Sequence, residues 1–312
     1  MITHNTKIYV AGHTGMVGSA CLRLLKSKGY NNLIFTTSKE LDLRSQNSVE
    51  DFFKTQKPEA VILAAAKVGG ILANKTYGYD FLMDNLNIQN NILSASEKYK
   101  VQKLVFLGSS CIYPKMALQP IKENYLLTGS LEETNQWYSI AKIAGVKAVE
   151  ALNKYKKTNY ISLMPTNLYG PNDNYDKNNS HVLPALIRKF NEAKSLNKDV
   201  YIWGSGEPLR EFLHVDDLAE AVLFVLEKNN LKHSLYNVGS GHEISIKNLA
   251  ILIQDIVGHN GEIKNDKTKP DGTPRKILDS SLLHHEGWRA QIGLKEGIIK
   301  TYKDFLAQED EL

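Results

Sequence analysis

The chain has 312 residues, of which 42% are hydrophobic and 23% charged, and it carries a formal net charge of +4 at pH 7. These values are ordinary for a globular protein with one large domain or a domain plus a lobe, and so mild a charge argues against a nucleic-acid-binding surface. The two cysteines predict neither a disulfide framework nor a metal site. No apolar run approaches the ~20 residues of a membrane span, and the N-terminus lacks the features of a secretory signal, so we expect a soluble cytoplasmic protein that does not bind a membrane.

The first half of the chain alternates short apolar, β-branched runs with longer helical patterns. Strands are predicted at 7–10, 33–36, 60–63, 103–107 and 160–164, and helices at 16–29, 46–55, 80–98 and 136–154. Near-continuous apolar strands separated by helices are typical of a parallel sheet that is covered on both faces. We therefore predict an α/β fold, a doubly wound parallel sheet of the Rossmann type.

After residue 165 the sequence becomes rich in Asn, Asp, Gly and Pro, which indicates loop. The predicted order is a loop at 165–180, a helix at 181–195, a strand at 199–203, a loop at 204–212, a helix at 216–228 and a strand at 234–239. The sequence pattern of the last third of the chain predicts a smaller C-terminal lobe.

Three glycines, Gly12, Gly15 and Gly18, directly follow the first predicted strand and open the first predicted helix. Glycine allows a tight turn and a close approach of the backbone to a pyrophosphate, and the helix N-terminus then favours the negative charge. The spacing G-x-x-G-x-x-G differs from the more familiar G-x-G-x-x-G. At this place in a strand–helix unit, the pattern favours a bound dinucleotide over a merely tight turn.

The end of the second predicted strand bears on which dinucleotide binds. Sites that prefer NAD usually carry an acidic residue here for the ribose 2′-hydroxyl, but this sequence has Thr-Thr-Ser-Lys at 36–39. Hydroxyl groups and a cation suit a 2′-phosphate, so Ser38 and Lys39 predict NADP, unless Lys39 is an ordinary surface lysine. Asp42 follows at a position from which its carboxylate could meet the adenine.

Tyr138 and Lys142 are spaced i and i+4 in a predicted helix and therefore share one face. An ammonium group beside a phenol favours the phenolate and lowers the pKa of the tyrosine towards the range useful for proton transfer. The spacing alone is common in helices. It gains significance here from the glycine-rich turn and from the predicted strand 103–107, which runs into the segment GSSCIYPK at 108–115.

Together these features resemble the extended short-chain dehydrogenase/reductase family, and within it the GDP-L-fucose synthases, which epimerise and reduce a GDP-4-keto-6-deoxy sugar. The resemblance extends over essentially the whole chain. The stretches that carry it are AAAKVGGI (64–71), GSSCIYPK (108–115), YSIAKIAG (138–145), MPTNLYGP (164–171), NSHV (179–182), WGSG (203–206), REFLHVDD (210–217) and KPDGTPRK (269–276). Thr14 and Ser38 depart from the pattern, because bacterial members often carry arginine at both places; Ser38 and Lys39 would then hold the 2′-phosphate.

The resemblance implies a GDP-sugar substrate with a ketone at C4, whose neighbouring protons on C3 and C5 are acidic enough to be removed. It assigns Cys111 as the base and His181 as the acid, and both side chains titrate within about two pH units of neutrality when unperturbed. NADPH would then reduce C4, with Tyr138 as proton donor, Lys142 as its support and Ser109 hydrogen-bonded to the carbonyl. From the residues alone, Cys111 could instead be a packing residue and His181 an ordinary residue of a helix's first turn.

The resemblance also implies further ligand contacts and a homodimer. Further cofactor contacts are expected at Thr14, Met16, Val17, Ala64, Ala65, Leu107, Gly108, Tyr138, Lys142, Pro165, Asn167, Leu168 and His181. Substrate contacts are expected at Ser109, Ser110, Asn167, Lys189, Trp203, Arg210, Asp271 and Arg275. The guanidinium groups of Arg210 and Arg275 offer a planar fork of donors that suits a diphosphate, whereas Trp203 could stack on the ligand or simply pack.

We expect an NADP-binding domain at 1–168, to which 208–238 returns, and a GDP-sugar-binding lobe formed by 169–207 and 239–312. An enzyme acting on a related GDP-4-keto-6-deoxyheptose, as a reductase alone or as a bifunctional enzyme, is not separated from this interpretation by the sequence.

Other enzyme classes and a non-enzymatic role fit the sequence less well. A 4,6-dehydratase would carry Thr-Asp-Glu where this chain has Ser-Ser-Cys at 109–111. A 4-epimerase would not need Cys111 and His181. A redox-sensing binding module would often have lost Tyr138 and Lys142.

Overall fold

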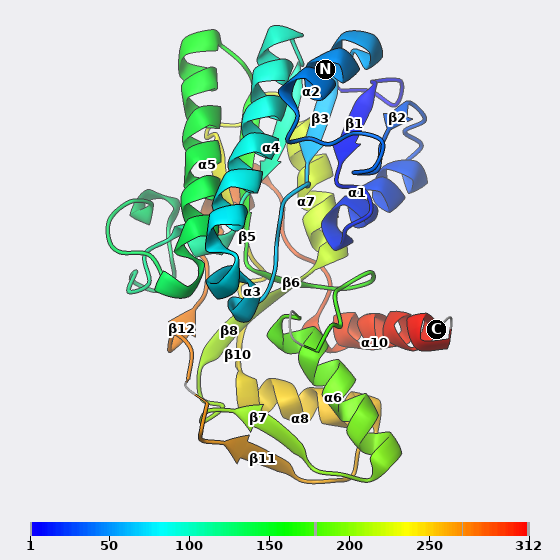
Figure 1. The fold of residues 1–312 in the computed structure, drawn as a ribbon, viewed down its shortest axis with the longest axis vertical. Coiled ribbons are helices and arrows are strands. Elements are labelled where there is room, and N and C mark those ends of the chain that lie inside the picture. Colours follow the sequence, from blue (N-terminus) through cyan, green and yellow to red (C-terminus); the bar gives the residue numbers. More distant parts are fainter. Residues whose placement is uncertain (1, 178–179, 270, 311–312) are drawn as a thin grey trace.

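The computed structural model describes residues 2–177, 180–269 and 271–310 and has two parts, a larger one around a parallel sheet and a smaller lobe that lies below it in Figure 1. The N-terminal half of the chain builds most of the larger part. The later chain builds the lobe but returns to the larger part with a helix at 215–227, a strand at 235–238 and a short helix at 281–286. In the part of the chain that the structure describes, no helix is both long and apolar enough to cross a membrane.

The larger part is organised around a six-stranded parallel sheet in the order β2-β1-β3-β4-β5-β9. Its strands are β1 (Ile8–Ala11), β2 (Leu33–Ile34), β3 (Ala60–Leu63), β4 (Lys103–Leu107), β5 (Tyr160–Pro165) and β9 (Leu235–Val238). Every residue of β1, β3, β4 and β5 is buried, which agrees with the continuous apolar runs in the sequence. The strand order reverses between β1 and β3, and such a switch point leaves a crevice for a ligand beyond the carboxyl ends of the strands. The predicted doubly wound α/β fold is confirmed.

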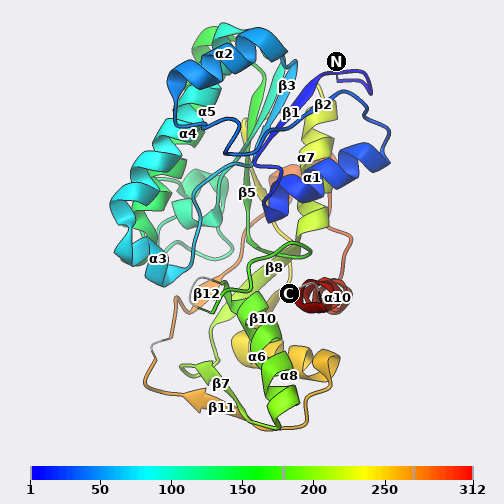
Figure 2. The ribbon, with the colours of Figure 1, turned by 45° about the vertical axis from the view of Figure 1, so that its right-hand side comes forward.

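Helices cover both faces of this sheet (Figure 2). One face is covered by α1 (Met16–Ser27) and α7 (Val215–Glu227), and the other by α2 (Gln46–Gln56), α4 (Gly78–Lys98) and α5 (Gln136–Lys156). The helices α4 and α5 lie side by side, and Gln89 Nε2 donates a hydrogen bond of 2.6 Å to Ala141 O between them. Gly145 lets α5 approach the sheet closely, because a Cβ there would lie 2.3 Å from Phe106 Cζ.

The lobe contains two small sheets with helices packed on them. Its elements are β6 (Asn167–Tyr169), α6 (Val182–Leu196), β7 (Val200–Trp203), β8 (Leu209–His214), β10 (Glu243–Ser245), α8 (Ile246–Val257), β11 (Ile263–Asp266), β12 (Arg275–Lys276) and α10 (Leu294–Asp310). The strands β7 and β11 pair with each other, while β8 lies between β10 and β12 and pairs also with β6. Shorter elements elsewhere are α3 (Ile71–Thr76), α9 (Ser281–Glu286) and 3-10 turns at Ser110–Ile112, Glu123–Tyr125 and Glu133–Asn135.

Two segments predicted as loops contain strands. The strand β6 lies within 165–180, of which residues 178 and 179 are outside the described residues, and β8 begins within 204–212. Both strands form because they pair with each other and β8 also pairs with β10 and β12. Pairing between distant segments leaves no local pattern in the sequence, so the Asn-, Gly- and Pro-rich composition dominated the prediction.

Candidate active site

The three glycines predicted to bind a cofactor form a tight turn between β1 and α1. Gly12 has a positive φ of 88°, and a Cβ on it would lie 2.6 Å from Ala65 N, beyond the end of β3. A Cβ on Gly18 would lie 2.0 Å from Gly12 O, whereas a Cβ on Gly15 would meet Gly12 O at an ordinary 3.6 Å. Gly15 is the N-cap of α1, and no side chain caps the first N–H groups of this helix. The turn at the switch point therefore fits the pyrophosphate of a dinucleotide.

The other residues expected to contact a dinucleotide surround this turn. Thr14 is exposed in the turn, Met16 and Val17 begin α1, Ala64 and Ala65 follow β3, Leu107 and Gly108 lie at the end of β4, Pro165 ends β5, and Asn167 and Leu168 lie in β6. Sequence reasoning missed Asn172, whose Nδ2 donates to Thr14 O at 2.9 Å. No local pattern marks this contact, because the two residues are 158 positions apart.

The turn after β2 carries an acidic residue that the sequence analysis did not consider. Glu40 Oε2 accepts hydrogen bonds from Thr37 N at 2.7 Å and from Thr37 Oγ1 at 2.8 Å, and these bonds lower the pKa of Glu40. Lys39 and the serine before it are exposed. The carboxylate of Asp42, which was expected near the adenine, is held by the guanidinium of Arg44. How strictly this turn selects NADP over NAD therefore stays a prediction.

Tyr138 and Lys142 lie on α5, where the helix passes the end of β4. Lys142 Nζ donates a hydrogen bond of 2.8 Å to Leu107 O and lies 5.8 Å from the centroid of the Tyr138 ring. Burial lowers the pKa of Lys142 to about 7. Burial also raises the pKa of Tyr138, and the charge of a Cys111 thiolate raises it further. The prediction that Lys142 lowers the pKa of this phenol is wrong for this structure, because desolvation disfavours the charged forms of both groups.

The segment GSSCIYPK leaves β4 beside this pair. Ser109 is the N-cap of a short 3-10 turn, and its Oγ accepts a hydrogen bond from Cys111 N at 3.3 Å. Ser110 is buried, whereas the free thiol of Cys111 is partly exposed. The 3-10 turn that contains Cys111 packs against α5, which carries Tyr138. These side chains therefore gather at the carboxyl end of β4.

Lys276 contacts Cys111 and acts electrostatically on His181. Lys276 lies in β12, and its Nζ is 3.7 Å from Cys111 Sγ. His181 is the exposed N-cap residue of α6, and its pKa is lowered by desolvation first and by the charge of Lys276 second. Sequence reasoning missed Lys276. No local pattern in the sequence marks it, because Lys276 and Cys111 are 165 positions apart.

The two arginines predicted to hold a diphosphate have partners within the protein. Arg275 pairs with Glu243 through hydrogen bonds of 2.8 and 2.9 Å. Arg210 Nη1 donates to Thr273 O at 2.6 Å, and burial lowers the pKa of Arg210. A substrate that used the Arg275 guanidinium would have to share it with Glu243, so the proposed roles of the two arginines stay predictions.

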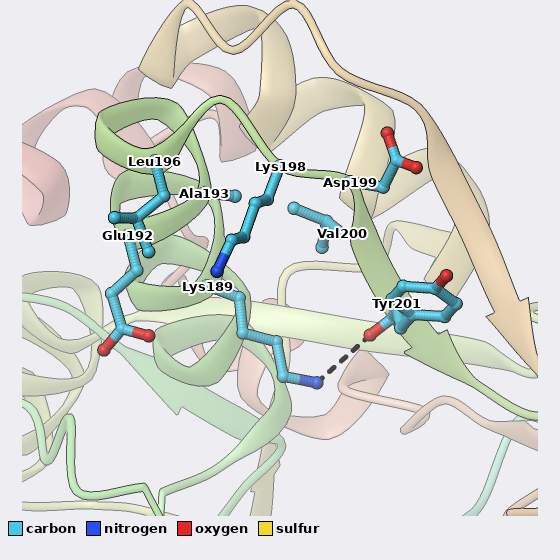
Figure 3. A pocket seen from close by; sticks show the side chains of 8 residues that line it. All are labelled: Lys189, Glu192, Ala193, Leu196, Lys198, Asp199, Val200 and Tyr201. Carbon is cyan, nitrogen blue, oxygen red and sulfur yellow. Dashed lines mark hydrogen bonds between the residues drawn. The ribbon is translucent and has the colours of Figure 1, made fainter.

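Trp203 and Lys189 lie together at the edge of the lobe. The Trp203 side chain is exposed, and Lys189 Nζ lies 6.0 Å from the centroid of its ring. Lys189 Nζ also donates to Tyr201 O at 3.2 Å, the contact drawn in Figure 3. A hollow of about 280 Å³ adjoins these residues along the C-terminal half of α6. Asp271 Oδ1 accepts a hydrogen bond of 2.8 Å from Ser205 N and so fixes the turn that follows Trp203.

Glu211 is a buried carboxylate that ties the lobe to the end of the sheet. Its side chain accepts hydrogen bonds from Gly241 N at 2.8 Å and from Leu278 N at 3.0 Å, while Glu211 O accepts one of 2.8 Å from Asn167 Nδ2. Burial raises the pKa of Glu211. Because Leu278 is two residues after Lys276, these contacts fix the segment that presents Lys276 to Cys111.

Comparison with known proteins identifies the family. The sequence profile of the NAD dependent epimerase/dehydratase family matches residues 8–239. The chain belongs to this family. Within the NAD dependent epimerase/dehydratase family, the putative GDP-L-fucose synthase 2 of Arabidopsis thaliana is 56% identical over 98% of this chain and 93% of its own length. The GDP-L-fucose synthase of Escherichia coli strain K12 is 49% identical over 97% of this chain and 98% of its own length.

A solved structure also matches nearly the whole chain. The GDP-mannoheptose C4 reductase from Campylobacter jejuni with NADP bound has a TM-score of 0.92 at 39% identity, covering 98% of this chain and 100% of that chain. The putative GDP-L-fucose synthase 2 of Arabidopsis thaliana and the GDP-L-fucose synthase of Escherichia coli, at 56% and 49% identity, confirm the resemblance expected from the sequence motifs.

Proposed function

We propose that the chain is an NADPH-dependent enzyme that inverts C3 and C5 of GDP-4-keto-6-deoxymannose and then reduces C4 to give GDP-L-fucose. The observation that carries this proposal is that two sets of groups meet beyond β4: the Tyr138–Lys142 pair, and Cys111 with Lys276 and His181. A reductase needs only the first set, whereas inversion also needs a base and an acid. The relatives named GDP-L-fucose synthase support the choice of substrate.

Bound NADPH would supply the hydride that reduces C4. The glycine-rich turn would hold its pyrophosphate at the N-terminus of α1, and Ser38 and Lys39 its 2′-phosphate after β2. The NADP bound to the Campylobacter jejuni reductase supports this choice of cofactor. Lys142 would contact the nicotinamide ribose from α5.

Epimerisation would use Cys111 and His181 on opposite sides of the sugar. The Cys111 thiolate takes a proton from C3 or C5, and the electron pair of the broken C–H bond passes into an enolate with its charge on the C4 oxygen. Ser109 and Tyr138 donate hydrogen bonds to that oxygen. Protonated His181 returns a proton to the other face of the carbon, and both groups then exchange protons with solvent before the second carbon is inverted.

Reduction would use the same donors around the C4 oxygen. Tyr138 gives its proton to the alkoxide that forms there, and its raised pKa keeps the phenol protonated until that moment. Lys142 Nζ lies 5.8 Å from the centroid of the Tyr138 ring and would stabilise the resulting phenolate, because a nearby negative charge favours the ammonium form and opposes the effect of burial. One set of hydrogen-bond donors thus serves the enolate and the alkoxide in turn.

We further propose a cytoplasmic homodimer that pairs through α4 and α5. Large apolar side chains are exposed on these helices, among them Tyr79, Trp137 and Ile140. Both cysteines are free, which suits the reducing cytoplasm. In the proposed division of labour, residues 1–168 with 208–238 bind NADP, and the remaining segments bind the GDP-sugar.

A related GDP-4-keto-6-deoxyheptose is the second candidate substrate. The observation that favours it is the high structural similarity to the Campylobacter jejuni GDP-mannoheptose C4 reductase. With this substrate the enzyme would reduce C4 in the same way, either after inversion at C3 and C5 or without it.

The experiment that tests the proposal is a panel of GDP-4-keto-6-deoxy hexoses and heptoses incubated with the protein and NADPH. We expect the NADPH absorbance to fall fastest with GDP-4-keto-6-deoxymannose, and NMR to identify the product as GDP-L-fucose. Oxidation of NADPH by the heptose alone would favour the second candidate. No substrate-dependent oxidation with any member of the panel would contradict both.

A further inference from the structure

Lys276 presents its ammonium group to a sulfur atom. Its Nζ lies 3.7 Å from Cys111 Sγ, and in the described part of the chain it forms no ion pair with a carboxylate. The contrast with Lys115 is informative, because Lys115 is only four residues after Cys111 in the sequence but pairs with Glu132 at 3.0 Å. The ammonium group of Lys276 is therefore available to interact with the Cys111 thiol.

We propose that Lys276 is the counterion of the Cys111 thiolate and so holds the base in its reactive form before substrate binds. Only the thiolate can accept a proton from C3 or C5, and an opposite charge at this distance favours the charged form of an ionisable group. This inference rests on the proposed function, because it takes Cys111 as the epimerisation base. It makes Lys276 a positioning residue that acts through the sulfur.

The groups that face Cys111 from the other elements do not replace Lys276. Tyr138 on α5 stays neutral, because its pKa is raised, and Lys142 on the same helix directs its hydrogen bond to the main chain of β4. The pKa of His181, the N-cap of α6, is lowered by desolvation first and by the charge of Lys276 second. A thiolate beside Lys276 would offset the second of these effects and so favour the imidazolium form that inversion requires.

The backbone around Lys276 holds it in place. Lys276 is paired in register with Arg210 across β12 and β8, and Leu278 N is anchored to the buried carboxylate of Glu211 at 3.0 Å. The ammonium group is therefore delivered by a strand and not by a free loop, which suits a fixed contact with the sulfur.

The charge balance of the proton transfer is also consistent with this role. When the thiolate takes the substrate proton, the S–H bond forms, the C–H bond breaks and the negative charge moves to the C4 oxygen of the enolate. The negative charge thus leaves the sulfur atom that Lys276 faces and passes to the C4 oxygen, where Ser109 and Tyr138 donate hydrogen bonds.

The test measures alkylation of Cys111 by iodoacetamide as a function of pH in the ligand-free protein. Cys21 is 1% exposed and Cys111→Ser supplies the blank, so the signal reports Cys111. We expect the pH midpoint of alkylation to rise by about 1–3 pH units in Lys276→Met, since the opposite charge is removed. Lys276→Arg should stay near the parent protein. The matched control is Lys115→Met, which removes a cation from the segment 108–115 that contains Cys111 and should leave the midpoint of alkylation unchanged.

A midpoint in Lys276→Met equal to that of the parent would overturn the proposal, and so would Lys276→Arg shifting as far as Lys276→Met. Should circular dichroism show that Lys276→Met is misfolded, Lys276→Gln is measured and judged by the same criterion. The readout uses no substrate, so it separates failure of this inference from failure of the proposed function, which the NADPH assay detects. In an active enzyme, Lys276→Met should slow deuterium incorporation at C3 and C5 tenfold or more at pH 7 and recover at higher pH. A residue that only bound the diphosphate would instead raise KM without a pH shift.

Discussion

Replacing Lys142 by methionine should stabilise the folded protein while it destroys the reductase activity. Lys142 is 3% exposed, and its ammonium group has one hydrogen bond, of 2.8 Å, to Leu107 O. A buried lysine with so few partners is destabilising, because water solvates its charge better in the unfolded chain. Methionine keeps the length and flexibility of the side chain and removes the charge.

The magnitude follows from the pKa of Lys142, which burial lowers from 10.5 to about 7. The difference of about 3.5 pH units corresponds to at most about 5 kcal/mol in the free energy of unfolding, reached at pH values below the folded-state pKa. Leaving Leu107 O without its donor costs about 1–3 kcal/mol, so we expect a net gain of about 2 kcal/mol at pH 7.

The gain should depend on pH with a definite sign. Between pH 7 and 10.5 the unfolded chain binds more protons at Lys142 than the folded protein does, so the stability of the parent rises with pH. By pH 9.5 the penalty from Lys142 has fallen to roughly 1.4 kcal/mol, and the advantage of methionine should disappear.

Urea unfolding of the ligand-free proteins at pH 7 and pH 9.5 measures this difference. The matched control is Lys147→Met on the same helix, because Lys147 is exposed and paired with Glu150, and it should change the stability by less than about 0.5 kcal/mol. A Lys142→Met protein that is less stable than the parent at pH 7, or whose advantage does not shrink at pH 9.5, would refute the argument from burial.

Further predictions concern the proposed chemistry and assembly. Tyr138→Phe should lower the rate of reduction about 10²–10⁴-fold with NADPH binding retained, and a rate within a few-fold of the parent would mean that the proton comes from another group. Lys39→Ala should narrow the preference for NADPH over NADH in kcat/KM; equal values for the two cofactors in the parent would contradict this role. Cys111→Ser should block deuterium incorporation at C3 and C5 while reduction of the unepimerised ketone partly survives, because a serine hydroxyl is a far weaker acid than a thiol; exchange at the parental rate would leave Cys111 a packing residue. Light scattering at micromolar concentration should find a dimer, and a monomer would count against pairing through α4 and α5.

The sequence by itself predicted the features that depend on residues close together in the sequence. The apolar runs of β1, β3, β4 and β5 mark strands buried on both faces, and they alternate with amphipathic helices, so the parallel sheet follows from the local pattern. The glycine-rich turn and the i, i+4 spacing of Tyr138 and Lys142 are likewise local, and the structure has both.

Contacts between distant segments were decided only by the tertiary structure. The strands β6 and β8 form by pairing with each other, although the segments 165–180 and 204–212 in which they begin are rich in residues typical of loops. The contact between Lys276 and Cys111 joins residues 165 positions apart, so no spacing rule reveals it. The pKa values are a second case, because the sequence places a lysine beside a tyrosine but does not show how strongly each group is desolvated. Desolvation depends on every atom packed around a group, and that packing exists only once the chain has folded.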